Sequence, residues 1–378
     1  MKKILIITGR YLPGYKDGGP VRTIKNLTDI LSDKYNFTIM CADRDHGDNK
    51  AYDGITYGEK NRVGNADVYY VKDGKYSFSD IKRLSEESDL VYVCGPYNDY
   101  AIKTLILNRL SLIKCPLVLA PMGSFSKGAL AIKSRKKQIF LSLIKLLNLF
   151  KNVVFSVTSE VEKTEMKEAM GLNNRCFVAE DPQRNIGEAP SHDLFKKDGI
   201  LNLVFLSRIS EKKNLLGTAE ILKNVHSRVK FCVYGTMEDA EYFEKCKEKL
   251  SKLPENISFS YMGEAESEKV PMILSGYDVF LFPTHGENFG HVISEALMAG
   301  CIPVISDTTP WLDFEKYKSG YVIKHEDYSS FAECIDMLAE KSEEELKKIS
   351  DNAKDYYIRK YEEQKTNNGY VRMFDELL

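Results

Sequence analysis

The side chains best suited to chemistry lie at residues 283–300, where a predicted strand gives way to a predicted helix. Gly286 and Gly290 allow a tight turn and a close approach of the backbone to a ligand. The free amides at the start of the helix suit an anion such as a diphosphate. Glu287 lies in the loop and Glu295 in the helix, so two carboxylates could contact different parts of one elongated ligand. The Glu-x7-Glu spacing alone is more typical of a capping acid and a solvated helix residue, but the flanks Phe-Gly and Glu-Ala-Leu-Met-Ala-Gly favour a ligand site.

Two further clusters follow predicted strands. Arg208 and Lys213 come after the strand at 201–206, where two cations could neutralise a leaving phosphate without a metal. Solvated surface charge is an equally good reading of that string taken alone. Gly18 and Gly19 lie in the loop after the first strand, and they suit either a ligand or an ordinary glycine-rich turn.

The elements that must position these residues follow an α/β pattern, because short apolar runs alternate with longer amphipathic stretches. Strands are expected at 4–7, 37–41, 68–71, 90–94, 117–120, 153–157, 201–206, 229–234, 257–261, 278–282, 302–305 and 321–323. Helices are expected at about 20–34, 78–87, 98–113, 129–150, 160–170, 213–226, 238–252, 266–275, 290–299 and 328–341. The nearly continuous apolar strands indicate parallel sheets that helices cover on both faces.

The length of 378 residues predicts two domains. A polar, proline-bearing stretch at about 181–199 is the expected linker, so we place the domains at 1–185 and 186–360. Both are expected to be doubly wound and Rossmann-like. Such sheets bind ligands at the carboxyl ends of their strands, which predicts a site in a cleft between the two domains.

Composition excludes several classes of protein. With 53 Lys and Arg against 55 Asp and Glu, the chain lacks the basic field that a nucleic-acid-binding protein needs. The eight cysteines show no metal-ligand spacing and indicate reduced, cytosolic thiols. The first apolar run, 4–7, is too short for a signal peptide, and no run reaches the length of a membrane-spanning helix. Asp43 and Asp45 have no metal-site context, so no metal site is expected.

Taken together, the three clusters resemble the retaining nucleotide-sugar glycosyltransferases of family 4, which have the GT-B fold. The match is in order as well as type: a glycine pair after the first strand, Ser-Arg-x4-Lys opening the second domain, and the 283–300 segment late in it. The resemblance implies an acceptor-side domain at 1–185 and a donor-binding domain at 186–360. It also implies a last helix, 361–378, that packs back on the first domain.

The resemblance assigns roles to individual residues. It implies that Glu287 holds the donor sugar at the reacting carbon and that Glu295 binds the nucleotide ribose. It places Arg208 and Lys213 on the donor diphosphate, with Glu287, Arg208 and Lys213 as the catalytic set. Other donor contacts are implied for Gly18, Gly19, Gly235, Asn288, Phe289, Gly290 and His291.

The implied reaction is transfer of a sugar from a nucleotide sugar, with a UDP-sugar favoured, to a glycan or lipid-linked glycan. This would serve synthesis of a cell-surface polysaccharide or glycolipid, and it would need no cofactor and no metal ion. Three departures stand out. Many members carry a first-domain histidine that is missing at 119–124, the usual Asn-Gly-Val-Asp-like segment is replaced at 180–185, and Ser207 stands where a glycine normally precedes the arginine.

Three other functions are alternatives to sugar transfer. A dehydrogenase is disfavoured because no G-x-G-x-x-G follows a strand. A nucleotide-sugar epimerase of GT-B-like fold stays open, and it would convert its substrate without an acceptor. A nucleotide-sugar-binding protein without transfer activity is the third, although intact Glu287, Glu295, Arg208 and Lys213 argue against it.

One stretch, 100–159, contains ten Lys and Arg and no acidic residue. Within it, a helix at 139–150 would be apolar except for a narrow stripe of Ser142, Lys145 and Asn148. Core packing and contact with an anionic membrane surface through 127–151 are both consistent with this pattern. We therefore expect a cytoplasmic protein that either stays free or lies peripherally at the inner face of the cell membrane.

Overall fold

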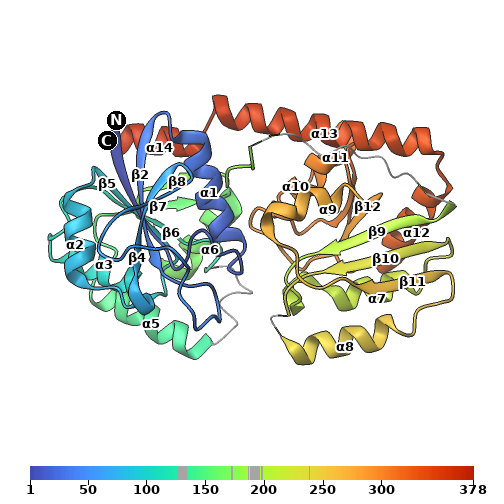
Figure 1. Ribbon diagram of the computed structural model, residues 1–378, viewed down its shortest axis with the longest axis horizontal. Helices are drawn as coiled ribbons and strands as arrows, with labels where there is room; N and C mark the ends of the chain where they lie inside the picture. Colours follow the sequence, from blue (N-terminus) through green and yellow to red (C-terminus); the bar gives the residue numbers. More distant parts are fainter. Residues whose placement is uncertain (126–133, 172, 186, 188–195, 197–198, 238) are drawn as a thin grey trace. The chain divides into compact units, whose positions relative to one another are not determined.

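The computed structural model describes residues 1–125, 134–171, 173–185, 187, 196, 199–237 and 239–378, and omits the side chains of 134–138. The chain divides into two compact units (Figure 1). Unit 1 consists of Met1–Asn185 and Gln364–Leu378, and unit 2 of Ile186–Glu363. Most of the linker expected at 181–199 lies outside the described residues.

Unit 1 is built on a sheet of eight strands in the order β3-β4-β2-β1-β5-β6-β7-β8. The strands are β1 (Lys2–Ile7), β2 (Tyr35–Ala42), β3 (Asn61–Val63), β4 (Ala66–Val71), β5 (Leu90–Cys94), β6 (Leu117–Ala120), β7 (Val153–Val157) and β8 (Cys176–Val178). All pairings are parallel except β3 with β4. The central strand β1 is completely buried from Ile4 to Ile7, because helices cover both faces.

Helices of unit 1 form two cores, one on each face of the sheet. One face is covered by α2 (Phe78–Glu86), α3 (Asp99–Arg109), α5 (Ser134–Leu146) and α6 (Glu160–Met170). The other face is covered by α1 (Gly19–Leu31) and α14 (Gly369–Leu377), the last helix of the chain. The expected helix at 129–150 is α5, and its positions 129–133 lie outside the described residues.

Unit 2 has a parallel sheet of six strands in the order β11-β10-β9-β12-β13-β14. These strands are β9 (Leu201–Leu206), β10 (Val229–Tyr234), β11 (Ile257–Tyr261), β12 (Val279–Phe282), β13 (Ile302–Ser306) and β14 (Tyr321–Ile323). Its helices are η3 (Glu211–Lys213), α7 (Leu215–Leu222), α8 (Ala240–Leu250), η4 (Ser267–Lys269), α9 (Val270–Leu274), α10 (His291–Ala299), α11 (Phe314–Tyr317), α12 (Tyr328–Glu340) and α13 (Glu343–Thr366), and the part of α13 from Gln364 onward belongs to unit 1. A single buried cluster joins the sheet and its helices.

Every strand expected from the sequence is present, and the prediction of two Rossmann-like α/β domains is confirmed. The short strands β3 and β8 and the helices α11 and α13 were not expected. The last helix packs on unit 1, as expected, but it does not extend over the whole of 361–378. Helix α13 continues to Thr366, and α14 starts anew at Gly369, because the Asn368 side chain accepts hydrogen bonds from the amides of Tyr370 and Val371 and caps the second helix.

Two further properties concern the surface and the thiols. Among the described residues, no helix has both the length and the hydropathy needed to cross a bilayer. All eight cysteines carry free thiols. Burial raises the pKa of Cys334 to about 12, which keeps that thiol protonated and unreactive at neutral pH.

Candidate active site

The loop that carries Glu287 connects β12 to α10 at the carboxyl end of the sheet in unit 2. It is held from both sides: the His285 amide donates to Lys212 O at 2.9 Å, and the Glu287 amide donates to Thr308 O at 3.2 Å. Gly290 adopts a positive φ of 83° and begins α10, and a Cβ there would lie 2.8 Å from Ile293 Cδ1. The positive φ is what favours the glycine predicted for this turn, since the Ile293 side chain could shift to admit a Cβ.

Lys213 and Glu287, both predicted to act on the donor, form an ion pair with Nζ and Oε1 2.5 Å apart. Their side chains are 13% and 10% exposed, so water screens the pair only weakly. Lys213 Nζ also lies 5.6 Å from the centroid of the Phe282 ring, at the end of β12.

Asn214 fixes the position of Lys213. It adopts the left-handed conformation, with φ 61°, and its side chain accepts from the Gly217 amide to cap α7. The same side chain donates from Nδ2 to Pro283 O at 2.8 Å, in the loop after β12. One asparagine thus joins the loop that carries Lys213 to the loop that carries Glu287.

Five other predicted donor residues lie on the strand ends, loops and helix of unit 2. Arg208 follows β9 and is exposed, and Glu295 is buried on α10. Phe289 is buried, and its carbonyl accepts from Trp311 Nε1 at 2.5 Å. The buried His291 ring packs edge-on against Phe289, with ring centroids 4.9 Å apart. Asn288 is partly exposed in the loop.

Gly235 has a structural explanation that needs no ligand. It follows β10, and its amide donates to Gly263 O at 2.9 Å. A Cβ at this position would lie 1.8 Å from Ser207 O, inside any permissible contact. The segments that follow β9 and β10 approach each other so closely that only glycine fits at position 235. The presence of glycine there is therefore no evidence for a nucleotide pocket.

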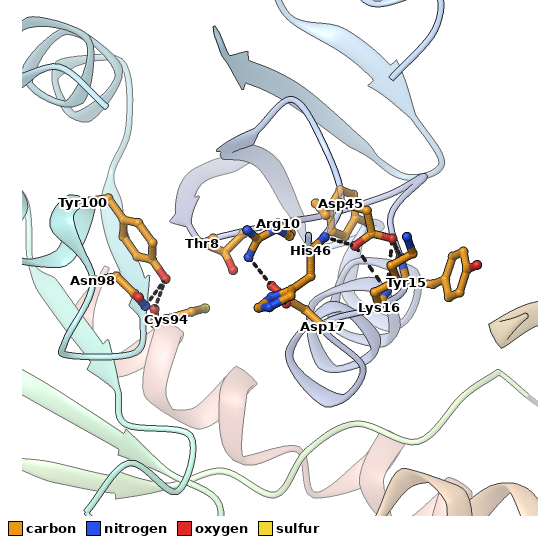
Figure 2. Close-up of polar contacts among 12 residues, drawn as sticks. Thr8, Arg10, Tyr15, Lys16, Asp17, Asp45, His46, Cys94, Asn98 and Tyr100 are labelled. Carbon is orange, nitrogen blue, oxygen red and sulfur yellow. Dashed lines mark hydrogen bonds and ion pairs between the residues drawn. The ribbon is translucent and has the colours of Figure 1, made fainter. Parts of the chain in front are cut away.

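Gly18 and Gly19 lie in unit 1, at the start of α1, where Gly18 has a φ of 67°. The loop before them is held by Asp45, which accepts from the amides of Tyr15 at 2.8 Å and Lys16 at 3.1 Å (Figure 2). Asp43 is buried; its burial is outweighed by hydrogen bonds from Arg44 and Tyr57, which lower the pKa of the carboxyl. Both acids of the Asp-x-Asp pair thus have loop-bracing partners.

A polar cluster in unit 1 was not predicted from the sequence. The Asp17 carboxylate lies between a guanidinium and an imidazole, with Arg10 Nη1 at 3.0 Å and His46 Nδ1 at 2.9 Å (Figure 2). Nearby, the Tyr100 hydroxyl donates to Cys94 O at 2.6 Å. Asp17 directly precedes the glycine pair, which is a weak signal, but no sequence pattern links it to a histidine 29 residues away.

Comparisons with known proteins fit this geometry. Residues 190–356 match the family described as glycosyl transferases group 1. None of the curated proteins matches the sequence. Among solved structures, HepE of Anabaena, crystallised with UDP and glucose, has a TM-score of 0.67 at 15% identity over 96% of both chains. Sucrose-phosphate synthase of Thermosynechococcus elongatus has a TM-score of 0.71 at 13% identity, covering 100% of this chain and 99% of that one.

WaaG, a glycosyltransferase involved in lipopolysaccharide biosynthesis, is a third similar structure, with a TM-score of 0.64 at 13% identity over 94% of this chain and 95% of that one. The likeness extends across both units and confirms the predicted GT-B fold. The family match lies on unit 2, the unit that carries Arg208, Lys213, Glu287 and Glu295. The chain is a glycosyltransferase.

Proposed function

We propose that this glycosyltransferase moves a sugar, with retention of configuration, from a nucleotide sugar held by unit 2 to a glycan or lipid-linked glycan held by unit 1. The reaction needs no metal ion, and it serves synthesis of a cell-surface polysaccharide or glycolipid. The observation that carries the proposal is the shielded Lys213–Glu287 pair beside the start of α10, within the segment that matches the glycosyltransferase family.

The diphosphate of the donor supplies the anion that this arrangement suits. Lys213 exchanges its Glu287 partner for a diphosphate oxygen, and the amides at the start of α10 add the positive end of the helix dipole. Arg208, exposed at the end of β9, provides a second cation. These charges stabilise the nucleoside diphosphate as it leaves, which is the role that a metal ion plays elsewhere.

The exchange also releases the Glu287 carboxylate. Without a ligand, that carboxylate is neutralised by Lys213 and accepts from the Thr284 hydroxyl at 3.2 Å. Once Lys213 has turned to the diphosphate, Glu287 can accept hydrogen bonds from the donor sugar. Donor binding therefore prepares the carboxylate beside the reacting carbon.

A uridine diphosphate sugar is the favoured donor. HepE of Anabaena was crystallised with UDP and with UDP-glucose, and its fold matches this chain over nearly its full length. Calorimetric titration of the full chain with UDP, GDP and ADP tests the preference. Tightest binding of UDP supports it, and tighter binding of GDP or ADP would overturn the choice of nucleobase while leaving sugar transfer intact.

The acceptor side is assigned to the Asp17–His46 pair. Asp17 orients the imidazole through Nδ1, which leaves Nε2 on a largely exposed ring to contact an acceptor hydroxyl. Replacing His46 by Ala should slow transfer to an acceptor but leave hydrolysis of the donor unchanged. Equal loss of both reactions would remove His46 from the acceptor site. Conversion of the donor sugar without any acceptor would instead point to an epimerase.

Helix α5 supports a membrane-associated acceptor. Its inner face packs on the unit 1 core through Leu141 and Ile144, so the core-packing expectation holds for that face. Its outer face exposes apolar side chains, at 62% for Ile139, 51% for Leu143 and 80% for Leu146, beside the exposed polar side chains of Ser142 and Lys145. The basic run 133–137 precedes this face in an acid-free stretch. Lys127 and Lys133 lie outside the described residues.

We assign this face to the anionic surface at the cytoplasmic side of the cell membrane. Each cation near lipid headgroups contributes about 1 kcal/mol, and the exposed apolar side chains can enter the interface. Co-sedimentation with vesicles that contain anionic lipid should fall as salt rises. It should also weaken when Lys133, Arg135, Lys136 and Lys137 are reversed to Glu.

Replacing exposed apolar side chains by Ser distinguishes membrane binding through α5 from nonspecific hydrophobic binding. Replacing Leu143 and Leu146 by Ser should weaken vesicle binding, whereas the control Met272→Ser, at another exposed apolar side chain in unit 2, should not. Equal sedimentation of all variants, or binding to neutral vesicles alone, would favour a soluble enzyme with a soluble acceptor.

A further inference from the structure

Two histidines and a glutamate come together at the edge of unit 2. His285 lies in the loop after β12, and His325 and Glu326 lie in the loop after β14. His285 Nδ1 is 3.0 Å from His325 Nε2, and that nitrogen is 3.7 Å from Glu326 Oε1. One potential ligand atom of each residue lies within 4.8 Å of the others. No other such group of three is found in the part of the chain that the structure describes.

The backbone holds both loops in place. The His285 amide donates to Lys212 O at 2.9 Å, and the His325 amide donates to Asp307 Oδ1 at 2.8 Å. Glu326 adopts the left-handed conformation, with φ 63°, which a residue with a side chain rarely adopts. The fold thus brings three potential ligands from two loops, 40 residues apart, to one point.

The distances approach those of a metal site. In a tetrahedral zinc site with bonds of about 2.0–2.1 Å, two ligand nitrogens lie about 3.3 Å apart. The two imidazole nitrogens here are 3.0 Å apart, with their rings at 89°, so small side-chain rotations would place an ion between them.

We propose that His285, His325 and Glu326 bind one divalent transition-metal ion, with Zn²⁺ the best chemical match. Two imidazoles and one carboxylate suit Zn²⁺ and its first-row neighbours, whereas Mg²⁺ and Ca²⁺ prefer oxygen ligands. The ion fastens the loop that contains Glu287 to the loop after β14. Sugar transfer does not depend on it, so the site goes beyond the proposed function.

The test is calorimetric titration of the metal-free full chain with Zn²⁺, with all cysteines reduced and no nucleotide present. One site per chain is expected. His285→Ala and His325→Ala should each weaken Zn²⁺ binding by about tenfold or more, because each removes a ligand atom. Glu326→Gln should weaken it by less, because the amide keeps an oxygen but loses the negative charge. The control is His226→Ala, which removes an exposed histidine that pairs with Asp336 and is not one of the proposed ligands.

A second readout separates this site from zinc held by cysteines. Co²⁺ bound by imidazole and carboxylate gives a visible spectrum without the strong thiolate-to-metal band, and that spectrum should vanish in the His285→Ala/His325→Ala double variant. The midpoint of thermal unfolding should rise with Zn²⁺ in the wild type and not in the double variant. Absence of binding by the wild type, or equal affinity in the folded double variant, would overturn the proposal. Neither result bears on sugar transfer.

Discussion

Lys213 Nζ lies 2.5 Å from Glu287 Oε1, and the two side chains are almost completely shielded from solvent. This ion pair joins the end of η3 to the loop after β12, and the proposed function assigns its two charges to the diphosphate and the sugar of the donor. A shielded pair is expensive to break unless a ligand replaces one partner. In the proposed reaction, the donor diphosphate is the ligand that replaces Glu287 as the partner of Lys213.

Glu287→Gln should reduce sugar transfer strongly while leaving the affinity for free UDP unchanged or higher. The substitution removes the carboxylate that competes with the diphosphate for Lys213, and it removes the proposed contact with the sugar. Turnover measurements and calorimetry on the same preparation separate the two effects. A marked loss of UDP affinity would place Glu287 on the nucleotide instead.

Lys213→Ala and Arg208→Ala should each lower turnover by roughly 10²–10³, the scale for loss of one preorganised charge donor. Lys212→Ala is the matched control, because its exposed side chain adjoins Lys213 in sequence and the substitution keeps the carbonyl that accepts from the His285 amide. Circular dichroism should be measured on Lys213→Ala to show that it is folded, because this substitution leaves Glu287 shielded without its cation. Wild-type turnover in both test variants would contradict the assignment.

Glu295→Ala should weaken the binding of UDP and of uridine alike, since its proposed partner is the ribose. The side chain is buried on α10, so Glu295→Gln, which retains size and a hydrogen-bond acceptor, distinguishes a lost contact from a lost fold. Calorimetry gives both affinities. If uridine and UDP bind as tightly to Glu295→Ala as to the wild type, the ribose lies elsewhere.

The sequence predicted most of the fold because its strands are short, apolar and bounded by turn residues. It missed β3 and β8, each only three residues long and partly exposed, since β3 (Asn-Arg-Val) has no apolar run and the apolar run of β8 (Cys-Phe-Val) is too short to be recognised as a strand. The break between α13 and α14 had a readable signal in Asn368-Gly369, a capping residue followed by a glycine.

Motifs also identified Lys213 and Glu287, but not their pairing. Contact across 74 residues depends on β9 and β12 being neighbours and on the Asn214 bond to Pro283 O. The Asp17–His46 pair could not be predicted for a similar reason, because the loop geometry that creates it is held by Asp45. The residues of a loop motif can be recognised in the sequence. Which side chains of two loops meet can be known only once the fold is known.

The stability of unit 1 should fall as pH rises from about 4 to about 7, because of Asp181. Burial, reinforced by the nearby Glu162 carboxylate, raises the pKa of Asp181 to about 7, against about 3.9 in an unfolded chain. The folded state therefore favours the protonated acid, and its contribution is complete below about pH 4 and lost as pH rises through about 7.

Asp181→Asn should remove this dependence. Relative to the wild type, the variant should gain more in thermal midpoint at about pH 8 than at about pH 5, since the amide stays neutral throughout. The measurement is thermal unfolding of both proteins followed at the two values of pH. If the two proteins differ in thermal midpoint by the same amount at both values of pH, the titration of Asp181 does not affect the stability of unit 1.

Phe374→Ala should destabilise unit 1 by about 3–5 kcal/mol, the usual cost of removing a buried aromatic ring. Phe374 on α14 is fully buried, and its ring packs edge-on against Tyr35 and Tyr92, at 5.3 Å and 6.3 Å between centroids. Ile358→Ala, at an exposed position on α13, is the control. A denaturation midpoint like that of the control would show that α14 adds little to this core.

The central claim is that unit 2 activates a nucleotide sugar with its own cations. The direct measurement is release of UDP from UDP-glucose and other UDP-sugars by the full chain in the presence of EDTA, with Lys213→Ala measured in parallel. We expect metal-independent release by the wild type with at least one sugar, and a loss of roughly 10²–10³ in the variant. Strict dependence on Mn²⁺ or Mg²⁺, or equal rates in the two proteins, would contradict the account.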